Sequence, residues 1–184
     1  MGFLRAGRVR TGWAALGLFA LTACQDPERP PPPCPNIVIV QDAAELTQFL
    51  PGPGRDLTDV TLEARISDFR GFCDTDVDDD DGTGTVEVEM QLILVATRGP
   101  ASTSREATLR YFVAIADTEE NILARKEFET TIAFERNRNR VALGEDLTQK
   151  IPLRGGQLGD AFNIFVGFQL SDADLEYNRN KRGR

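Results

Sequence analysis

The chain has 184 residues, with 21 basic side chains, 29 acidic side chains and no histidine, and its formal net charge is −8. Such an acidic chain repels nucleic acid and anionic membrane surfaces, which disfavours a nucleic-acid-binding role. The absence of histidine removes the commonest general base, the usual catalytic triads and most zinc sites.

The N-terminal segment has the order of a secretory signal. Residues 1–10 carry three arginines and no acid, residues 11–20 are apolar, and LTAC follows at positions 21–24. The apolar run is shorter than the roughly 20 residues of a membrane-spanning helix. LTAC resembles the lipobox of bacterial lipoproteins, which implies cleavage after residue 23 and lipid attachment, palmitate included, at Cys24. An ordinary cleaved signal peptide is the alternative.

The lipobox resemblance also implies a location. Gln25 stands after the lipidated cysteine in place of the aspartate that marks inner-membrane lipoproteins, which implies the outer membrane more than the inner membrane. We therefore expect a lipid-anchored protein of the cell envelope that faces the periplasm. Loss of residues 1–23 leaves 18 basic against 29 acidic side chains, a net charge of −11.

Once Cys24 carries the lipid, Cys34 and Cys73 remain as an even pair. In an oxidising compartment the two are predicted to form a disulfide, and a closed loop of about 40 residues contributes roughly 4 kcal/mol of stability in the chain-entropy model. A redox-active pair is the alternative, but it would more often show a C-x-x-C spacing.

The mature chain is predicted to be one domain on a linker. Residues 24–33 hold the lipidated cysteine and the sequence QDPERPPPP, which favours a polyproline II spacer of roughly 28 Å. The domain itself is expected over residues 34–178, and residues 179–184 (RNKRGR) are expected to form a flexible basic tail.

Two short helices are predicted at the ends of this domain. After a short apolar strand at residues 36–40, the Asp42-Ala43-Ala44-Glu45 sequence has the spacing of a capping box and predicts a helix up to Leu50. Ser171 and Asp174 have the same spacing and predict a C-terminal helix.

The rest of the domain alternates with period two. Apolar residues recur at every second position in six further segments, each bounded by turn residues. The segments are 60–66, 86–94, 109–115, 128–134, 141–153 and 162–170. With residues 36–40, this pattern predicts an all-β, immunoglobulin-like two-sheet sandwich of about seven antiparallel strands. A small open barrel is the alternative.

Four apolar residues point away from the predicted core: Ile93, Val95, Phe112 and Phe165. If their strands are neighbours, these side chains form one exposed apolar face, which we interpret as an interaction surface for a partner. The alternative is that the N-terminal segment or the C-terminal helix covers them.

Six aspartates lie among the eight positions 74–81. Asp76, Asp78 and Asp80, with Glu87, have the ligand spacing of an EF-hand calcium loop, but Asp81 stands where the invariant glycine should be and the flanks alternate as strands. Two interpretations stay open: a weak calcium site, which would be the only cofactor, and a solvated hairpin loop. Residues 136–140 (RNRNR) are interpreted as a second charged turn.

Catalytic motifs are missing from the sequence. There is no Gly-x-Ser-x-Gly, no Ser-x-x-Lys and no phosphate-binding glycine loop before a helix. We therefore expect no enzymatic activity. A hydrolase that uses two carboxylates is the lesser alternative, because any two acids can converge in a fold.

The chain resembles a family of small alphaproteobacterial lipoproteins at residues 55–60 (RDLTDV), 150–153 (KIPL) and 166–179 (VGFQLSDADLEYNR). The likeness covers Cys34 to Arg179 and implies no catalytic activity. We expect a non-enzymatic binding or scaffolding module whose partners are the membrane, through its anchor, and another envelope protein. A calcium-dependent binding module that uses residues 74–81 is the alternative function.

Overall fold

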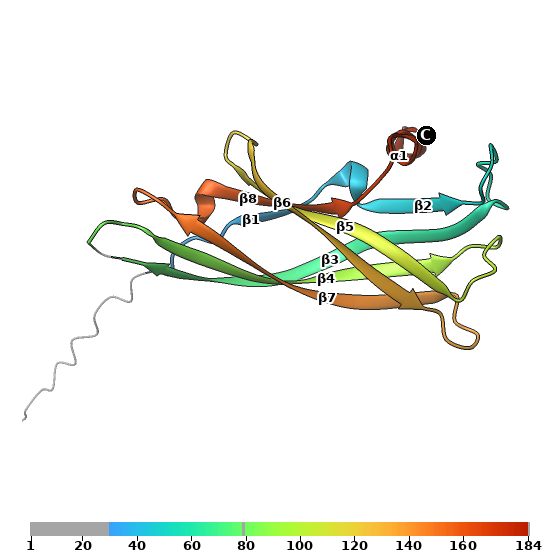
Figure 1. Ribbon diagram of the computed structural model, residues 1–184, viewed down its shortest axis with the longest axis horizontal. Coiled ribbons are helices and arrows are strands. Elements are labelled where there is room, and N and C mark those ends of the chain that lie inside the picture. The colour runs from blue at the N-terminus through green and yellow to red at the C-terminus, as the bar shows by residue number, and fades with distance from the viewer. Residues whose placement is uncertain (1–29, 79, 184) are drawn as a thin grey trace, which may run out of the picture. The chain divides into compact units, whose positions relative to one another are not determined.

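Two four-stranded sheets make up the part of the chain that the computed structural model describes, residues 30–78 and 80–183 (Figure 1). The chain divides after Pro31, and all the elements below belong to the second unit, Pro32–Arg184. In chain order they are β1 (Asn36–Ile39), η1 (Gln41–Ala43), β2 (Glu45–Phe49), β3 (Val60–Val77), β4 (Gly84–Arg98), β5 (Glu106–Asp117), β6 (Ile122–Ala133), β7 (Arg140–Leu153), η2 (Gly159–Ala161), β8 (Phe162–Phe168) and α1 (Asp172–Arg182).

The predicted immunoglobulin-like two-sheet sandwich is confirmed, with eight strands among the described residues where about seven were expected. Sheet A has the order β1-β8-β5-β6 and sheet B has the order β2-β3-β4-β7. All pairings are antiparallel except that of β1 with β8, which is parallel.

The core lies between the two sheets and uses the alternation seen in the sequence. Leu92 and Leu94 of β4 and Ile164 and Val166 of β8 are completely buried, as is Leu109 of β5. Each such side chain contributes roughly 1.5–3 kcal/mol when it leaves water, so the alternating strands bury one face each.

Strand β3 changes its buried face halfway along. Ile66 pairs with Leu94 while Asp68 pairs with Ile93, so Ser67 is the extra residue of a β-bulge. Because side chains alternate with period two, the bulge brings Phe69 and Cys73 to the inner face, where the even-numbered residues lay before it.

The helix expected from Asp42 to Leu50 is wrong. Only Gln41–Ala43 form one short 3-10 turn, without a side-chain cap, and residues 45–49 are strand β2. Asp42 pairs with Arg179 and Arg182 instead of capping a helix, and Leu46 is buried on the inner face beside Ala64. Tertiary contacts therefore outweigh the local capping signal.

The C-terminal helix is confirmed, but its predicted end is wrong. The side chain of Ser171 accepts a hydrogen bond from the Asp174 N–H, and the Asp174 side chain accepts one from the Ser171 N–H. The helix continues to Arg182, so the expected flexible tail from residue 179 is largely the last turns of α1. Within residues 30–78 and 80–183, no helix has both the length and the apolar character that crossing a membrane requires.

Candidate functional site

The predicted disulfide between Cys34 and Cys73 is present, with the two Cα atoms 5.8 Å apart. It joins the residues just before β1 to the inner face of β3, where Cys73 pairs with Val88. The bond thus ties the chain before the first strand of sheet A to β3, an inner strand of sheet B. Cys24, the predicted lipid-attachment residue, lies outside the described residues.

The aspartate-rich segment forms the last residues of β3, up to Val77, and the start of the hairpin loop between β3 and β4. The Asp78 N–H donates to the Thr83 carbonyl at 2.8 Å, and the Asp78 carboxylate accepts from the Asp80 N–H at 2.8 Å. Asp81 accepts from both the hydroxyl and the N–H of Thr83, and these bonds lower the pKa of the Asp81 carboxyl. These contacts build a hydrogen-bonded turn.

The three predicted calcium ligands lie in different parts of this hairpin. Asp76 lies on strand β3 opposite Thr85, Asp78 accepts a bond from the loop backbone, and Asp80 is exposed. No group of three or more acidic, cysteine or histidine side chains placed to hold a metal occurs within residues 30–78 and 80–183.

The predicted single interaction face is wrong, because its four residues lie on different sheets. Ile93 and Val95 point outward from β4 in sheet B, whereas Phe112 of β5 and Phe165 of β8 belong to sheet A. The alternation correctly placed all four on outer faces, but the strands of the two pairs are not neighbours.

The N-terminal segment covers part of the outer face of sheet A. A Cβ atom on Gly167 would lie 2.7 Å from the Cβ of Ala43 in η1 and 3.0 Å from the ring of Phe112. The Arg125 guanidinium lies over the same ring, 4.1 Å from its centroid. Phe112 is therefore half-buried, and Phe165 is half-buried as well.

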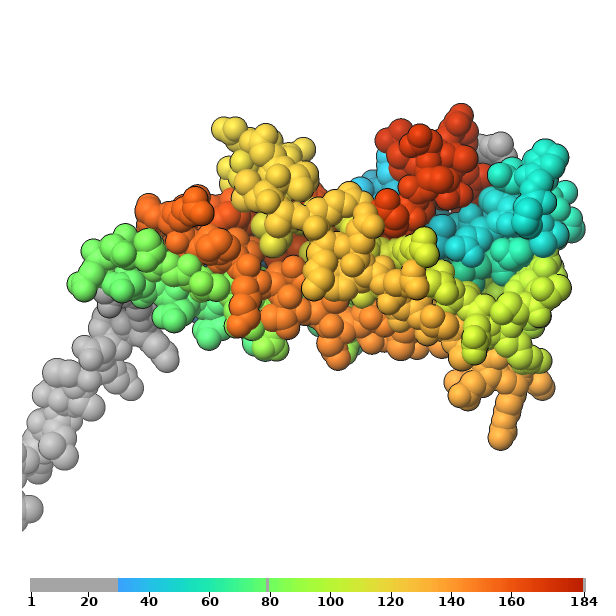
Figure 2. All heavy atoms as spheres, viewed as in Figure 1, coloured from blue at the N-terminus to red at the C-terminus, as the bar shows by residue number. Residues whose placement is uncertain are grey.

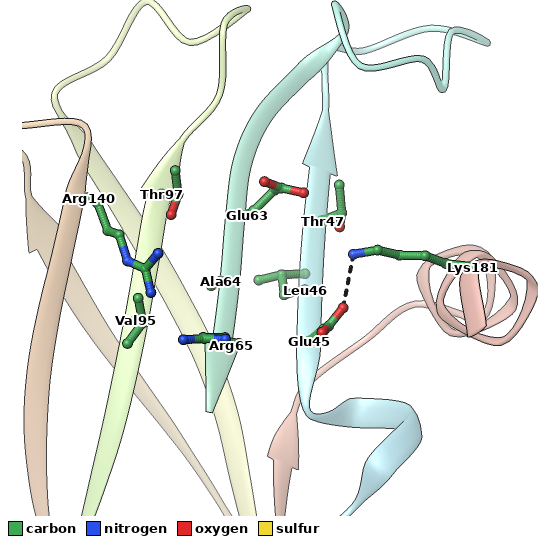
Figure 3. Close-up of a pocket in the computed structure, with 10 residues that line it drawn as sticks. All are labelled: Glu45, Leu46, Thr47, Glu63, Ala64, Arg65, Val95, Thr97, Arg140 and Lys181. Atoms are coloured by element: carbon green, nitrogen blue, oxygen red, sulfur yellow. Dashed lines mark hydrogen bonds and ion pairs between the residues drawn. The ribbon is translucent and has the colours of Figure 1, made fainter. Parts of the chain in front are cut away.

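The outer face of sheet B carries a shallow pocket of about 190 Å³, which we call the arginine pocket (Figure 3). Strand register explains its make-up, because Arg65 pairs with Val95 and Thr97 pairs with Arg140. The two arginines come from β3 and β7 on either side of β4, and their side chains flank Val95. The pocket is lined by Glu45, Leu46, Thr47, Glu63, Ala64, Arg65, Val95, Thr97, Arg140 and Lys181.

The three cationic side chains of this pocket differ in their partners. Lys181 of α1 forms an ion pair with Glu45 at 3.0 Å, and that contact raises the pKa of Lys181 (Figure 3). Arg65 and Arg140 form no ion pair with any residue that the structure describes. Two guanidinium groups without a carboxylate partner can bind an added anion through paired N–H donors.

A larger groove of about 590 Å³ lies where β8 ends beside β5. Its lining includes hydroxyl and amide side chains, among them Gln48, Ser102 and Thr108. Its arginine, Arg110, already pairs with Glu129 at 2.7 Å. The one cation of this groove is therefore paired within the protein, unlike Arg65 and Arg140 of the arginine pocket.

A partly buried polar cluster joins the two sheets near the β6 and β7 edges. Glu145 of β7 accepts hydrogen bonds from the Tyr111 hydroxyl at 3.1 Å and from the Thr130 hydroxyl at 2.8 Å. Burial, together with the charge of Glu145, raises the pKa of Tyr111, whose side chain is 1% exposed. Because the Tyr111 hydroxyl is shielded from solvent, we interpret this cluster as one that holds the two sheets together.

Sequence reasoning missed Arg65, Lys181 and Glu145 and singled out Arg140 only as part of a charged turn. Glu145 had a visible signal, because it interrupts the inward alternation of Leu143 and Leu147. The pocket arginines had none, since each occupies an ordinary outward position of a strand.

The structure defines a disulfide-bonded, two-sheet β-sandwich with a charged pocket on the outer face of one sheet. No family model matches the chain, and no curated protein matches it. A crystal structure of a glycosyl hydrolase family 2 member from Bacteroides cellulosilyticus DSM 14838 is similar over 54% of this chain and 16% of its own, at 18% identity and a TM-score of 0.26. A second structure of a family 2 member from Bacteroides cellulosilyticus covers 54% and 15%, at 19% identity and a TM-score of 0.25. This chain thus spans less than a fifth of either matched chain, and at these TM-scores the likeness carries no argument about activity.

Proposed function

We propose that the protein is a lipid-anchored module of the cell envelope that faces the periplasm and binds or scaffolds other envelope components. The observation that carries this proposal is the disulfide between Cys34 and Cys73. Disulfides form and persist in oxidising compartments, so the bond supports export of the chain. The LTAC sequence directly upstream then supports Cys24 as the point of attachment.

The arrangement of the domain supports presentation of a surface. The disulfide holds the start of the sandwich at Cys34, immediately after the proline-rich linker. Strand β3 of 18 residues runs toward that region, since Cys73 lies near its end, and strand β4 of 15 residues returns from it as the second strand of one long hairpin. A stiff linker followed by a cross-linked sandwich presents side chains on strands, which hold their positions better than loops do.

Radiolabelled palmitate added to growing cells tests the anchor. The wild-type chain is expected to incorporate label and to enter the detergent phase, whereas Cys24→Ala is expected to do neither. The matched control is Cys34→Ala with Cys73→Ala, which removes the other cysteines and should keep the label. Equal labelling of the wild-type chain and Cys24→Ala would contradict lipid attachment at this residue.

Crosslinking in intact cells, followed by mass spectrometry, tests the binding role. The wild-type chain is expected to give a reproducible crosslink to another envelope protein, and Arg65→Gln with Arg140→Gln is expected to lose it. Recovery of the same products with both chains would show that the arginine pocket is not the binding surface.

A further inference from the structure

Opposite charges gather at the two ends of the described sandwich. The β3–β4 hairpin loop carries Asp78, Asp80 and Asp81, all exposed, and we call these three residues the acidic loop. The arginine pocket lies toward the other end of the same strands, and the β6–β7 loop with Arg136 and Arg138 lies at that end too. Figure 2 shows the acidic loop in green and the β6–β7 loop in orange, at opposite ends of the sandwich in this view.

The acidic loop is held in shape by its own hydrogen bonds. Asp78 and Gly82 close the turn through the bond from the Gly82 N–H to the Asp78 carbonyl at 2.9 Å. The Gly156 N–H also donates to the Gly82 carbonyl at 3.2 Å, which braces the loop against the β7–β8 connection. Its three named carboxylates form no ion pair within the described part of the chain. Asp78, Asp80 and Asp81 therefore present carboxylates without a cationic partner among the described residues.

The arginine end is ordered in a similar way. The Arg105 guanidinium donates to the carbonyls of Phe134 and Arg136, which ties the β4–β5 loop to the β6–β7 loop. The Arg98 N–H donates to the Asn139 carbonyl at 2.7 Å. Arg65 and Arg140 stand on paired strands beside this region. Arg65 and Arg140 thus have fixed backbones and form no ion pair within the described residues, whereas the pocket's third cation, Lys181, is paired with Glu45.

The acidic loop cannot reach the arginine pocket of its own molecule. Arg65 and Val77 lie on the same strand, β3, and the loop follows Val77 directly. A β-strand rises about 3.3 Å per residue, so the stretch between them spans roughly 40 Å. Any contact between the two surfaces therefore joins two molecules.

We propose that the arginine pocket binds the acidic loop of a second copy of this chain. The charges are complementary, and the planar carboxylates of aspartate match the paired N–H donors of guanidinium groups. Because each copy uses one surface to donate and the other to accept, the contact is head-to-tail and can continue from copy to copy. The proposal rests on the proposed function, in that anchoring to one membrane would raise the local concentration of copies.

Sedimentation velocity of the chain from Gln25 onward, which contains the whole second unit, tests this contact. At low salt, about 20 mM, the weight-average sedimentation coefficient is expected to rise with protein concentration. At about 500 mM salt the association is expected to weaken at least tenfold, because ion pairs at a surface are screened.

Two blocked variants make the test specific. Arg65→Gln with Arg140→Gln removes the two guanidinium charges of the pocket, and Asp78→Asn with Asp80→Asn and Asp81→Asn removes three carboxylate charges of the loop while keeping their hydrogen-bond acceptors. Each variant alone is expected to stay monomeric. An equimolar mixture is expected to form dimers and stop there, because only one complementary pair of surfaces remains.

Matched controls remove the same charges elsewhere. Arg70→Gln with Arg154→Gln takes away two exposed arginines outside the pocket, and Glu119→Gln with Asp160→Asn and Glu176→Gln takes away three exposed acids outside the loop. Both sets are expected to associate as the wild-type chain does. Association by either blocked variant alone, or none in their mixture, would overturn the proposal.

A monomeric wild-type chain at every concentration would also overturn it. In that case, flotation with phosphatidylglycerol vesicles that depends on Arg65 and Arg140 would assign the pocket to a lipid phosphate instead. These outcomes are separate from the proposed anchor, since palmitate labelling at Cys24 gives its result whether or not copies associate.

Discussion

Two contacts hold the N-terminal stretch of the domain against the sandwich, and they differ in kind. At one end the Cys34–Cys73 disulfide ties the chain before β1 to β3 covalently. At the other end α1 holds η1 and β2 through hydrogen bonds and ion pairs. The first contact responds to reduction, and the second responds to salt and pH.

The comparison shows why each contact is needed. The stretch changes sheets at η1, since β1 is an edge strand of sheet A and β2 is an edge strand of sheet B. These strands have only 4 and 5 residues, so neither can be held by strand pairing alone. An uncovered strand edge also invites pairing with other chains, and α1 lies against the edge of β2.

Removal of the disulfide is expected to have the largest effect. Cys34→Ala with Cys73→Ala opens a cross-link between positions separated by 39 residues. The chain-entropy model gives a loss of roughly 4 kcal/mol in the free energy of unfolding. Urea unfolding measures this loss, and dithiothreitol added to the wild-type chain should reproduce it. If the loss in the free energy of unfolding depended strongly on salt, it would come from ion pairs rather than from the disulfide.

Asn178 is the centre of the second contact. Its side-chain amide donates to the carbonyls of Asp42 at 3.0 Å and Glu45 at 2.7 Å, and the residue is 4% exposed. Asn178→Ala leaves both carbonyls without this donor, and the expected loss in the free energy of unfolding is about 2–3 kcal/mol. The exposed neighbour Asn180→Ala serves as the control and should change stability by less than about 0.5 kcal/mol. Equal effects of the two substitutions would contradict this role.

The long strands could be predicted from the sequence because one face of each is buried. Val86, Val88 and Met90 alternate with Glu87 and Glu89, and this pattern holds in β4 as far as Leu94. Such a signal is local, since it depends only on which side chains avoid water. It also placed Ile93 and Phe112 on outer faces correctly, but it carried no information about which sheet each strand joins.

The remaining features depend on contacts between distant residues. Residues 42–50 have a local helix signal, yet Asp42 pairs with Arg179 and Asn178 bonds to Asp42 and Glu45, which favours a turn and a strand. The arginine pocket depends on the register of β3, β4 and β7, and the bulge at Ser67 alters the first of these. A bulge cannot be read from alternation alone, because it swaps the faces without changing composition.

Asp42 gives the smallest and most conditional effect. Its carboxylate pairs with Arg179 at 2.8 Å and Arg182 at 2.7 Å, and the hydrogen bond from Arg179 lowers the pKa of Asp42. A carboxyl with a lowered folded pKa adds stability that is fully present above its unfolded value, near pH 3.9, and is lost as the pH falls through the folded value.

The wild-type chain should therefore have a higher melting temperature than Asp42→Asn at pH 6, and the two should converge at the acidic end. About 1 M salt at pH 6 should also narrow the difference, because exposed ion pairs are screened. Glu176→Gln on the exposed side of α1 is the control and should show no such convergence. If the difference in melting temperature stayed constant from pH 6 to pH 2.5, Asp42 would act through its shape rather than its charge. The contact at α1 would then be as insensitive to pH as the disulfide.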